Sequence, residues 1–336
     1  MNHEILGFTI LFIGSIMSGV FALPMKFQRK WAWEKSWFVY SFWSTIFFPV
    51  VLTLFVNRNI FSILAEIPLK DILVVALFGF IWGIGSVLFG LGLKKLGLSI
   101  GYAIMMGLIN AFGTLIPIAI NQPDTFKTIS GLFVIIGLLV IIVGIIFLSR
   151  VHAHTKAKQE NIQISKRNFI SGLIICIITG IIGPFINFAF VFGSALKSAA
   201  LAHETLPFFS ANIIWFVALI TGFIPNAAYC LYLMKKNKTY KESNNFVLKN
   251  HIFGFLSGLF WFASVWLYGV GVDLLGTLGV TIGWAFFQSF AIIAGNFAGG
   301  ITGDWKNLTK RGYFYNFLGI AILILGVFVL MLPNIK

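Results

Sequence analysis

Charged residues are scarce in this chain of 336 residues, and their scarcity excludes an ordinary soluble globular protein. Asp, Glu, Lys and Arg together make up only 10% of the residues, whereas soluble domains carry about 25%. Hydrophobic residues make up 59% of the sequence, and the mean hydropathy is +0.95. The composition therefore predicts an integral membrane protein.

Cysteine is also rare, and nucleotide-binding motifs are absent from the sequence. The two cysteines, Cys176 and Cys230, both fall inside apolar stretches, which indicates neither a disulfide framework nor a zinc site. His152 and His154 stand without further ligands, so we expect no metal site and no cofactor. No Walker sequence and no nucleophile–base pair is present, so we expect neither an ATP-driven pump nor an enzyme.

What the chain does contain is a series of apolar runs, each about the length that a helix needs to cross a bilayer. We expect an all-α integral membrane fold with ten transmembrane helices. These lie near residues 5–24, 36–56, 71–93, 98–120, 128–149, 168–190, 207–233, 250–268, 274–299 and 314–332. The first run reads as a span rather than a cleaved signal peptide because many others follow it.

The basic residues predict how the spans are oriented. Nineteen of the 24 Lys and Arg residues lie in the odd-numbered connections, and an excess of these residues marks cytoplasmic loops. We therefore expect a multi-pass protein of the cytoplasmic (inner) membrane with both termini on the outer side. This distribution also explains the net charge of +14 without nucleic acid as a partner.

Two segments share a Gly-x-Gly-x4-Gly frame 179 positions apart, residues 90–97 and residues 269–276. Each is expected to form a tight turn between two spans, basic at Lys94-Lys95 in the first and acidic at Asp273 in the second. Opposite charge at matching turns predicts two five-helix repeats inserted in opposite orientations. The predicted organisation is a first repeat over 1–150, a basic cytoplasmic linker over 151–167 and a second repeat over 168–336.

Polar and aromatic side chains recur at helical spacing within several spans, and polar groups in a membrane turn away from lipid. Aromatic faces beside amides and hydroxyls suit a neutral, hydroxyl-rich solute. The same residues could instead serve helix packing or interfacial anchoring. The predicted substrate contacts are Trp82, Ser86, Asn110, Asn187, Trp261, Ser264, Trp284 and Gln288.

None of the ten acidic residues lies in the middle of a predicted span. Proton coupling usually relies on an ionisable group in or beside the membrane path. The remaining candidates for proton coupling are Glu34 and Asp273 at span ends, or His203 and Glu204 in an outer loop. We expect each of them to be a solvated loop charge. A facilitator without ion coupling therefore stays open.

Several motifs resemble the L-rhamnose/proton symporter family of the drug/metabolite transporter superfamily. They are Pro24-Met25-Lys26, Lys30-Trp31-Ala32-Trp33-Glu34 with Trp37, Phe78-Gly79 with Trp82-Gly83-Ile84-Gly85, Gly90-Leu91, Leu96-Gly97-Leu98-Ser99-Ile100-Gly101, Gly113-Thr114-Leu115, Trp284 and Trp305. The resemblance covers essentially the whole chain. It implies a ten-helix inverted-repeat fold and uptake of a deoxy sugar with a proton.

The chain departs from the rhamnose members of that family at four places. They have Asn where Ser86 stands and Tyr at Phe89, an acidic residue near Val280 and a His near Gln288. We predict a secondary transporter that takes up a small, L-rhamnose-like sugar, by proton symport and alternating access. The alternatives are a facilitator or exporter of an amino acid, nucleoside or drug, and a non-transporting membrane sensor or subunit. The expected partners are the polar solute, a proton, the lipid bilayer and, as an open question, a second copy in a homodimer.

Overall fold

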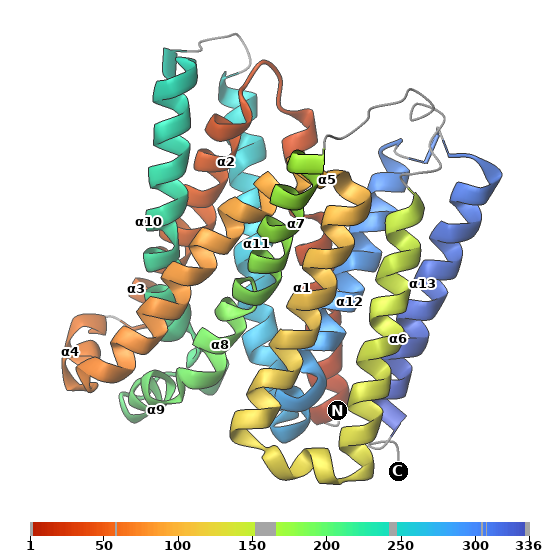
Figure 1. Cartoon of the computed structure of the whole chain (residues 1–336). Coiled ribbons are helices and arrows are strands. Elements are labelled where there is room, and N and C mark those ends of the chain that lie inside the picture. Colours follow the sequence, from red (N-terminus) through yellow and green to blue (C-terminus); the bar gives the residue numbers. More distant parts are fainter. Residues whose placement is uncertain are drawn as a thin grey trace. The chain divides into compact units, whose positions relative to one another are not determined.

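The computed structural model describes residues 3–57, 59–151, 166–241, 247–303, 305–306 and 308–332, with the side chains of 93–94, 96–103, 166–168 and 241 left aside (Figure 1). Helices account for the regular structure of these residues, and no β-sheet occurs among them. Most of the predicted linker 151–167, including His152 and His154, lies outside the described residues.

The prediction of ten membrane-spanning helices is confirmed. Within the described residues, ten helical stretches are long and apolar enough to cross a membrane. They run over His3–Phe27, Trp33–Val56, Leu69–Gly92, Ile104–Asn121, Ile129–Val151, Phe169–Ala202, Pro207–Asn237, Val247–Leu275, Thr277–Ile301 and Lys310–Met331. Hydropathy locates spans well because every backbone polar group in lipid must be bonded internally, which helices alone achieve within one segment.

The backbone at the two predicted turns, Lys94-Lys95 and Asp273, is helical. In the first, residues 90–97 are helical and belong to α5, which runs over Leu69–Asn121. In the second, helical structure continues past Asp273 to Leu275, and the break comes at Gly276, where φ is +57°. Glycine adopts a positive φ without the steric cost that a Cβ brings, so the chain turns at the last glycine of the second frame.

The chain folds as two compact units, and each unit draws helices from both halves of the sequence. Unit 1 comprises Met1–Val87 and Phe185–Leu274, and unit 2 comprises Leu88–Pro184 and Leu275–Lys336. The units therefore do not follow the predicted repeats 1–150 and 168–336. The inverted relation of those repeats stays a prediction.

Unit 1 contains the N-terminal helices, the first part of α5 and the helices between Phe185 and Leu274. Its elements besides α5 are α1 (His3–Val20), η1 (Pro24–Phe27), α2 (Trp33–Phe42), η2 (Trp43–Phe47), α3 (Phe48–Val56), α4 (Ile60–Glu66), α8 (Phe185–Phe192), α9 (Ser194–Ala202), η6 (Pro207–Phe209), α10 (Asn212–Asn237), η7 (Thr239–Lys241) and α11 (Val247–Leu275). Helix α10 packs along α2 and α3.

The second span of unit 1 is interrupted by a π-helical turn, η2. Pro49, at the start of α3, has no N–H to give to the carbonyl one turn earlier. The chain widens there, and the N–H of Phe48 bonds to the carbonyl of Trp43, five residues back. Side chains reinforce the wide turn, since the hydroxyls of Ser44 and Thr45 both donate to the carbonyl of Ser41.

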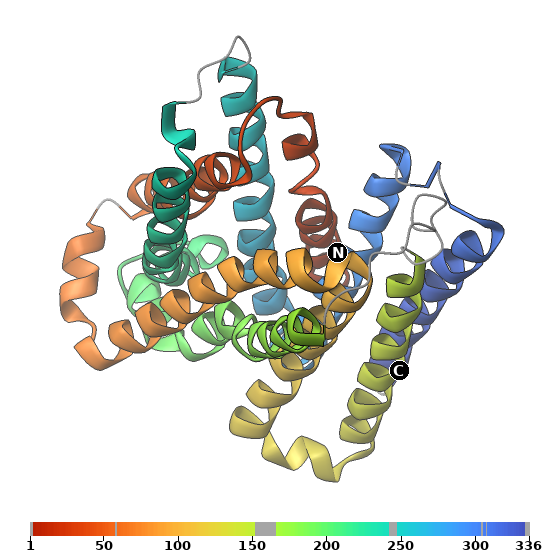
Figure 2. The same cartoon turned by 45° about the horizontal axis from the view of Figure 1, so that its top comes forward.

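Unit 2 contains the second part of α5 with η3 (Pro123–Lys127), α6 (Ile129–Val151), α7 (Lys166–Ile182), α12 (Thr277–Ile301) and α13 (Lys310–Met331). Helices α6 and α13 lie side by side along their lengths (Figures 1 and 2). Glycines permit this approach, since a Cβ at Gly137 or Gly144 would crowd Leu330 or Leu323 of α13.

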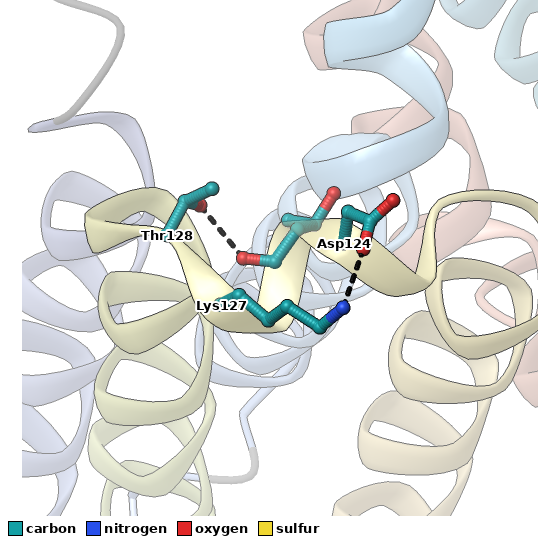
Figure 3. A network of polar contacts seen from close by, with 4 residues as sticks. Asp124, Lys127 and Thr128 are labelled. Atoms are coloured by element: carbon teal, nitrogen blue, oxygen red, sulfur yellow. Dashed lines mark hydrogen bonds and ion pairs between the residues drawn. The ribbon is translucent and has the colours of Figure 1, made fainter.

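The short η3 turn joins α5 to α6 through local polar contacts (Figure 3). Lys127 Nζ lies 2.8 Å from the carboxylate of Asp124, and the hydroxyl of Thr128 donates to the carbonyl of Thr125 at 2.7 Å. The Asp124 and Lys127 side chains are 86% and 81% exposed. This pair therefore contributes little to stability.

Polar contacts in unit 1 group the span ends into two sets, as alternating spans require. At one end, Asn237 at the end of the seventh span and Thr239 just after it donate to Glu34 at the start of the second span. At the other, Asn57 after the second span donates to the hydroxyl of Thr205 after the sixth, at 3.0 Å. The grouping matches odd and even connections on opposite sides.

Candidate functional site

Two tryptophans from distant parts of the chain stack on each other in unit 1. Trp82 of α5 and Trp261 of α11 have ring centroids 5.0 Å apart and planes inclined by 20°. Both side chains are half-buried, so part of each ring stays accessible. The structure thus brings together two of the residues that the sequence predicted as aromatic walls.

A hydrogen-bond network centred on Asn226 of α10 lies beside the Trp82 helix segment. The Oδ1 of Asn226 accepts the indole N–H of Trp37 at 3.0 Å and the hydroxyl of Ser86 at 3.3 Å. Its Nδ2 donates to the carbonyls of Gly83 at 3.2 Å and Gly222 at 3.0 Å. Asn226 is buried and uses both ends of its amide, so its orientation is fixed.

Small residues let α5 and α10 approach closely enough to support this network. A Cβ at Gly79 would overlap the carbonyl of Ala218, and one at Gly222 would lie 2.9 Å from the Trp82 ring. Close contact between small residues is a usual way for membrane helices to associate. Because Gly222 has no side chain, the Trp82 ring packs directly against its backbone.

The other predicted contacts of unit 1 bond within the helix bundle. Ser264 donates to the carbonyl of Trp261 in its own helix at 2.6 Å. Asn187 of α8 accepts the hydroxyl of Tyr268 of α11, so it joins these two helices. One turn before Trp261, the buried hydroxyl of Ser257 has no hydrogen-bond partner among the described residues. A buried hydroxyl without a partner is costly, which favours a water or solute there.

Unit 2 places Trp284 of α12 against α5. Its indole N–H donates to the carbonyl of Ile109 at 3.2 Å, and a Cβ at Gly113 would overlap its ring. Asn110 and Thr114 of α5, which directly follow Ile109 and Gly113 in the sequence, are 0% and 1% exposed. Neither amide atom of Asn110, nor the Thr114 hydroxyl, has a partner among the described residues. Such orphaned groups usually bind an ordered water or ligand.

Gln288, the last predicted contact, is half-buried one turn after Trp284 on α12. The three predicted contacts of unit 2 therefore lie on two helices that contact each other, Asn110 on α5 and Trp284 and Gln288 on α12. Among the described residues, no hydrogen bond joins Asn110 to Gln288. For all eight predicted contacts, binding of substrate stays a prediction.

Glu34 and Asp273 are not solvated loop charges, contrary to the sequence-based expectation. Glu34 is 6% exposed, and its Oε1 accepts 2.9 Å hydrogen bonds from both Asn237 and Thr239. Asp273 is paired with Lys197, and these side chains are 24% and 29% exposed. The helices continue beyond their expected limits: α2 begins at Trp33, and α11 ends at Leu275, so both carboxylates belong to helices.

Sequence reasoning missed Asn226 and the role of Trp37 beside it. Asn226 follows Pro225 inside the seventh span. A proline followed by an amide in an otherwise apolar span is a usable signal, because both disturb the helical bonding of the segment. Its partners on α2 and α5, however, could be recognised only in three dimensions.

Comparison with known proteins agrees with this architecture. The model of the L-rhamnose-proton symport protein (RhaT) family matches residues 1–334. Two similar relatives are the L-rhamnose-proton symporters of Escherichia coli O1:K1 / APEC and of Escherichia coli strain ATCC 8739. Each is 27% identical over 322 residues, which cover 94% of this chain and 93% of the relative. With its ten spans matched almost from end to end, this chain belongs to the L-rhamnose-proton symport protein family.

Proposed function

We propose that this protein is a secondary transporter of the cytoplasmic membrane that takes up L-rhamnose, or a closely similar deoxy sugar, together with a proton. Family membership supports the transport class and the coupling ion. The observation that carries the substrate class is the stacked, half-buried pair Trp82–Trp261 beside the Ser86–Asn226 network. No enzymatic activity is proposed.

The chemistry of these residues suits a deoxy sugar. The indole faces stack on the apolar C–H side of the ring and its methyl group, while hydroxyl and amide groups bind the sugar hydroxyls. The amide of Asn226 is fully used within the protein, so its role is to orient Ser86 and Trp37. Ser86 is then the direct polar contact in this part of unit 1. Asn110, Trp284 and Gln288 are the corresponding contacts proposed in unit 2.

For proton coupling we propose Asp273, which forms the ion pair with Lys197 near one end of α11. A proton on the carboxylate would weaken this pair and free the Lys197 ammonium, so the charge of the site would change with proton binding. Glu34 is the less suitable carboxylate because two fixed donors, Asn237 and Thr239, already hold it. Alternating access would then link the proton step to sugar uptake.

Uptake into proteoliposomes tests the proposal. Purified protein is reconstituted, and labelled L-rhamnose, a hexose with a 6-hydroxyl, an amino acid and a nucleoside are supplied with and without an imposed pH gradient. We expect saturable rhamnose uptake that exceeds equilibrium only when the outside is more acidic. Uptake to equilibrium regardless of the gradient would identify a facilitator, and transport of the amino acid or nucleoside alone would overturn the sugar assignment.

A further inference from the structure

A cavity of about 340 Å³ opens in unit 1 where η1 and the residues just after it meet the first turns of α11. The described residues that line it are Lys26, Phe27, Arg29, Lys249, Asn250 and Phe253. Three of these six residues are cationic and none is acidic. None belongs to the proposed sugar site, so the cavity needs an explanation of its own.

Hydrogen bonds hold the two sides of this cavity together. The Nδ2 of Asn250 donates to the carbonyl of Arg29 at 2.8 Å, and its Oδ1 accepts the Arg29 N–H at 3.0 Å. Gln28 Nε2 donates to the carbonyl of Asn250, also at 2.8 Å. Asn250 itself is 1% exposed. These bonds join segments more than 200 positions apart, so Lys26, Arg29 and Lys249 are brought to one place by the fold.

The electrostatics of the cavity favour an anion. Lys249 and Asn250 belong to the first turn of α11, and the N-terminal end of a helix adds a partial positive charge. Glu34, the acidic residue at the start of α2, is not among the described residues that line the cavity. Arg and Lys together recognise phosphate oxygens, the first by its planar fork and the second as a point charge.

One wall of the cavity is aromatic. The rings of Phe27 and Phe253 lie 5.9 Å apart, and Phe27 is 52% exposed. The lining residues lie at the ends of spans, except Arg29, which is in the connection between the first and second spans. The interface between hydrocarbon and headgroups is expected at such positions. An apolar wall beside a cationic one matches a group that carries both phosphate and hydrocarbon.

We propose that this cavity binds a phosphate group at the membrane surface, supplied either by the headgroup of an anionic phospholipid or by phosphate in solution. It is separate from sugar transport and does not depend on the proposed substrate. Basic groups near a membrane surface each contribute about fivefold to the binding of anionic lipid. Removing two of the three cations should therefore weaken binding roughly 25-fold.

Thermal unfolding of the purified full-length protein in detergent tests this proposal. The additives are phosphatidylglycerol, phosphatidylcholine with the same acyl chains, and inorganic phosphate against chloride at equal ionic strength. The variants are Lys26→Gln/Lys249→Gln and the charge-retaining Lys26→Arg/Lys249→Arg. The matched control is Lys235→Gln/Lys236→Gln, which removes two exposed cations near the end of α10, outside the cavity.

We expect phosphatidylglycerol, but not phosphatidylcholine, to raise the unfolding temperature of the wild type, the Arg variant and the control. The Gln variant of the cavity should need about 25 times more lipid for the same shift. A shift with inorganic phosphate alone, lost in the same variant, would assign the site to soluble phosphate. Equal responses of the cavity and control Gln variants, or no response to either anion, would overturn the proposal.

Discussion

The side-chain oxygen of Asn226 accepts the indole N–H of Trp37 at 3.0 Å, and the hydroxyl of Ser86 shares the same oxygen at 3.3 Å. One buried amide thereby connects α2, α5 and α10 of unit 1. The hydroxyl that we propose as a sugar contact takes its orientation from a residue that does not itself contact the sugar. Asn226 is therefore a positioning residue, and its substitution makes a specific prediction.

We predict that Asn226→Ala lowers both stability and transport. The substitution leaves the half-buried Trp37 N–H without its partner. Loss of a typical hydrogen bond costs about 0.5–1.5 kcal/mol. The folded protein that remains should also bind rhamnose more weakly, because the Ser86 hydroxyl loses the partner that orients it. Thermal unfolding and the KM of uptake measure the two effects. Asn59→Ala, at an exposed asparagine whose side chain makes no cap hydrogen bond, is the control. A normal KM in the Asn226 variant would remove it from the site.

The close approach of α5 and α10 leads to a second prediction. Gly79→Ala places a Cβ against the backbone of Ala218, which cannot move without separating the helices. Such overpacking typically costs 1–3 kcal/mol, and we expect a lower unfolding temperature with reduced uptake. Gly107→Ala is the matched control on the same helix, since a Cβ there meets only Ile142 at 3.9 Å. Equal stability of the two variants would show that α5 and α10 are not in close contact at Gly79 and Ala218.

The pairing of Asp273 with Lys197 gives a third prediction, which concerns coupling. Asp273→Asn should abolish accumulation driven by a pH gradient while rhamnose exchange at equal concentrations on both sides continues. Asn keeps the shape of the side chain but cannot exchange a proton. The exposed pair Asp124–Lys127 provides the control, because Asp124→Asn removes an equivalent charge from a solvated site. If Asp273→Asn still accumulates rhamnose against a gradient, another group carries the proton.

Gln288 gives a fourth prediction. Gln288→Ala should raise the KM for rhamnose about tenfold, the effect of losing a hydrogen bond worth about 1.4 kcal/mol. The amount of folded protein in the membrane should be unchanged, since the described residues give this half-buried side chain no hydrogen bond to lose. Uptake at several rhamnose concentrations, normalised to the folded protein, measures the effect. An unchanged KM would remove Gln288 from the predicted contacts.

Amino-acid composition was sufficient to predict the spans, but not the bends between them. Gly90 and Gly92 suggested a turn, yet residues 90–97 are helical. A glycine permits a turn without requiring one, and the helix satisfies its own backbone bonds where lipid offers none. Gly276 differs because its φ is positive, a backbone property that glycine spacing alone does not reveal.

The candidate site was predictable where it depended on helical spacing and not where it depended on distant contacts. Trp82 and Trp261 were both identified from the polar and aromatic faces of their own spans. Asn226 was missed because its partners lie on other helices. The burial of Glu34 was missed for the same reason, since Asn237 and Thr239 come from a connection about 200 positions away.

Rhamnose uptake by the Trp261→Ala variant tests the central claim most directly. In proteoliposomes with an acidic exterior, the wild type should accumulate labelled L-rhamnose. The variant should show roughly tenfold lower uptake at low sugar concentration, because it loses the stacking surface shared with Trp82. Trp305→Ala, at a tryptophan in unit 2 that packs on Gly300, serves as the comparison. Uptake by a folded Trp261→Ala protein equal to that of the wild type would contradict the account.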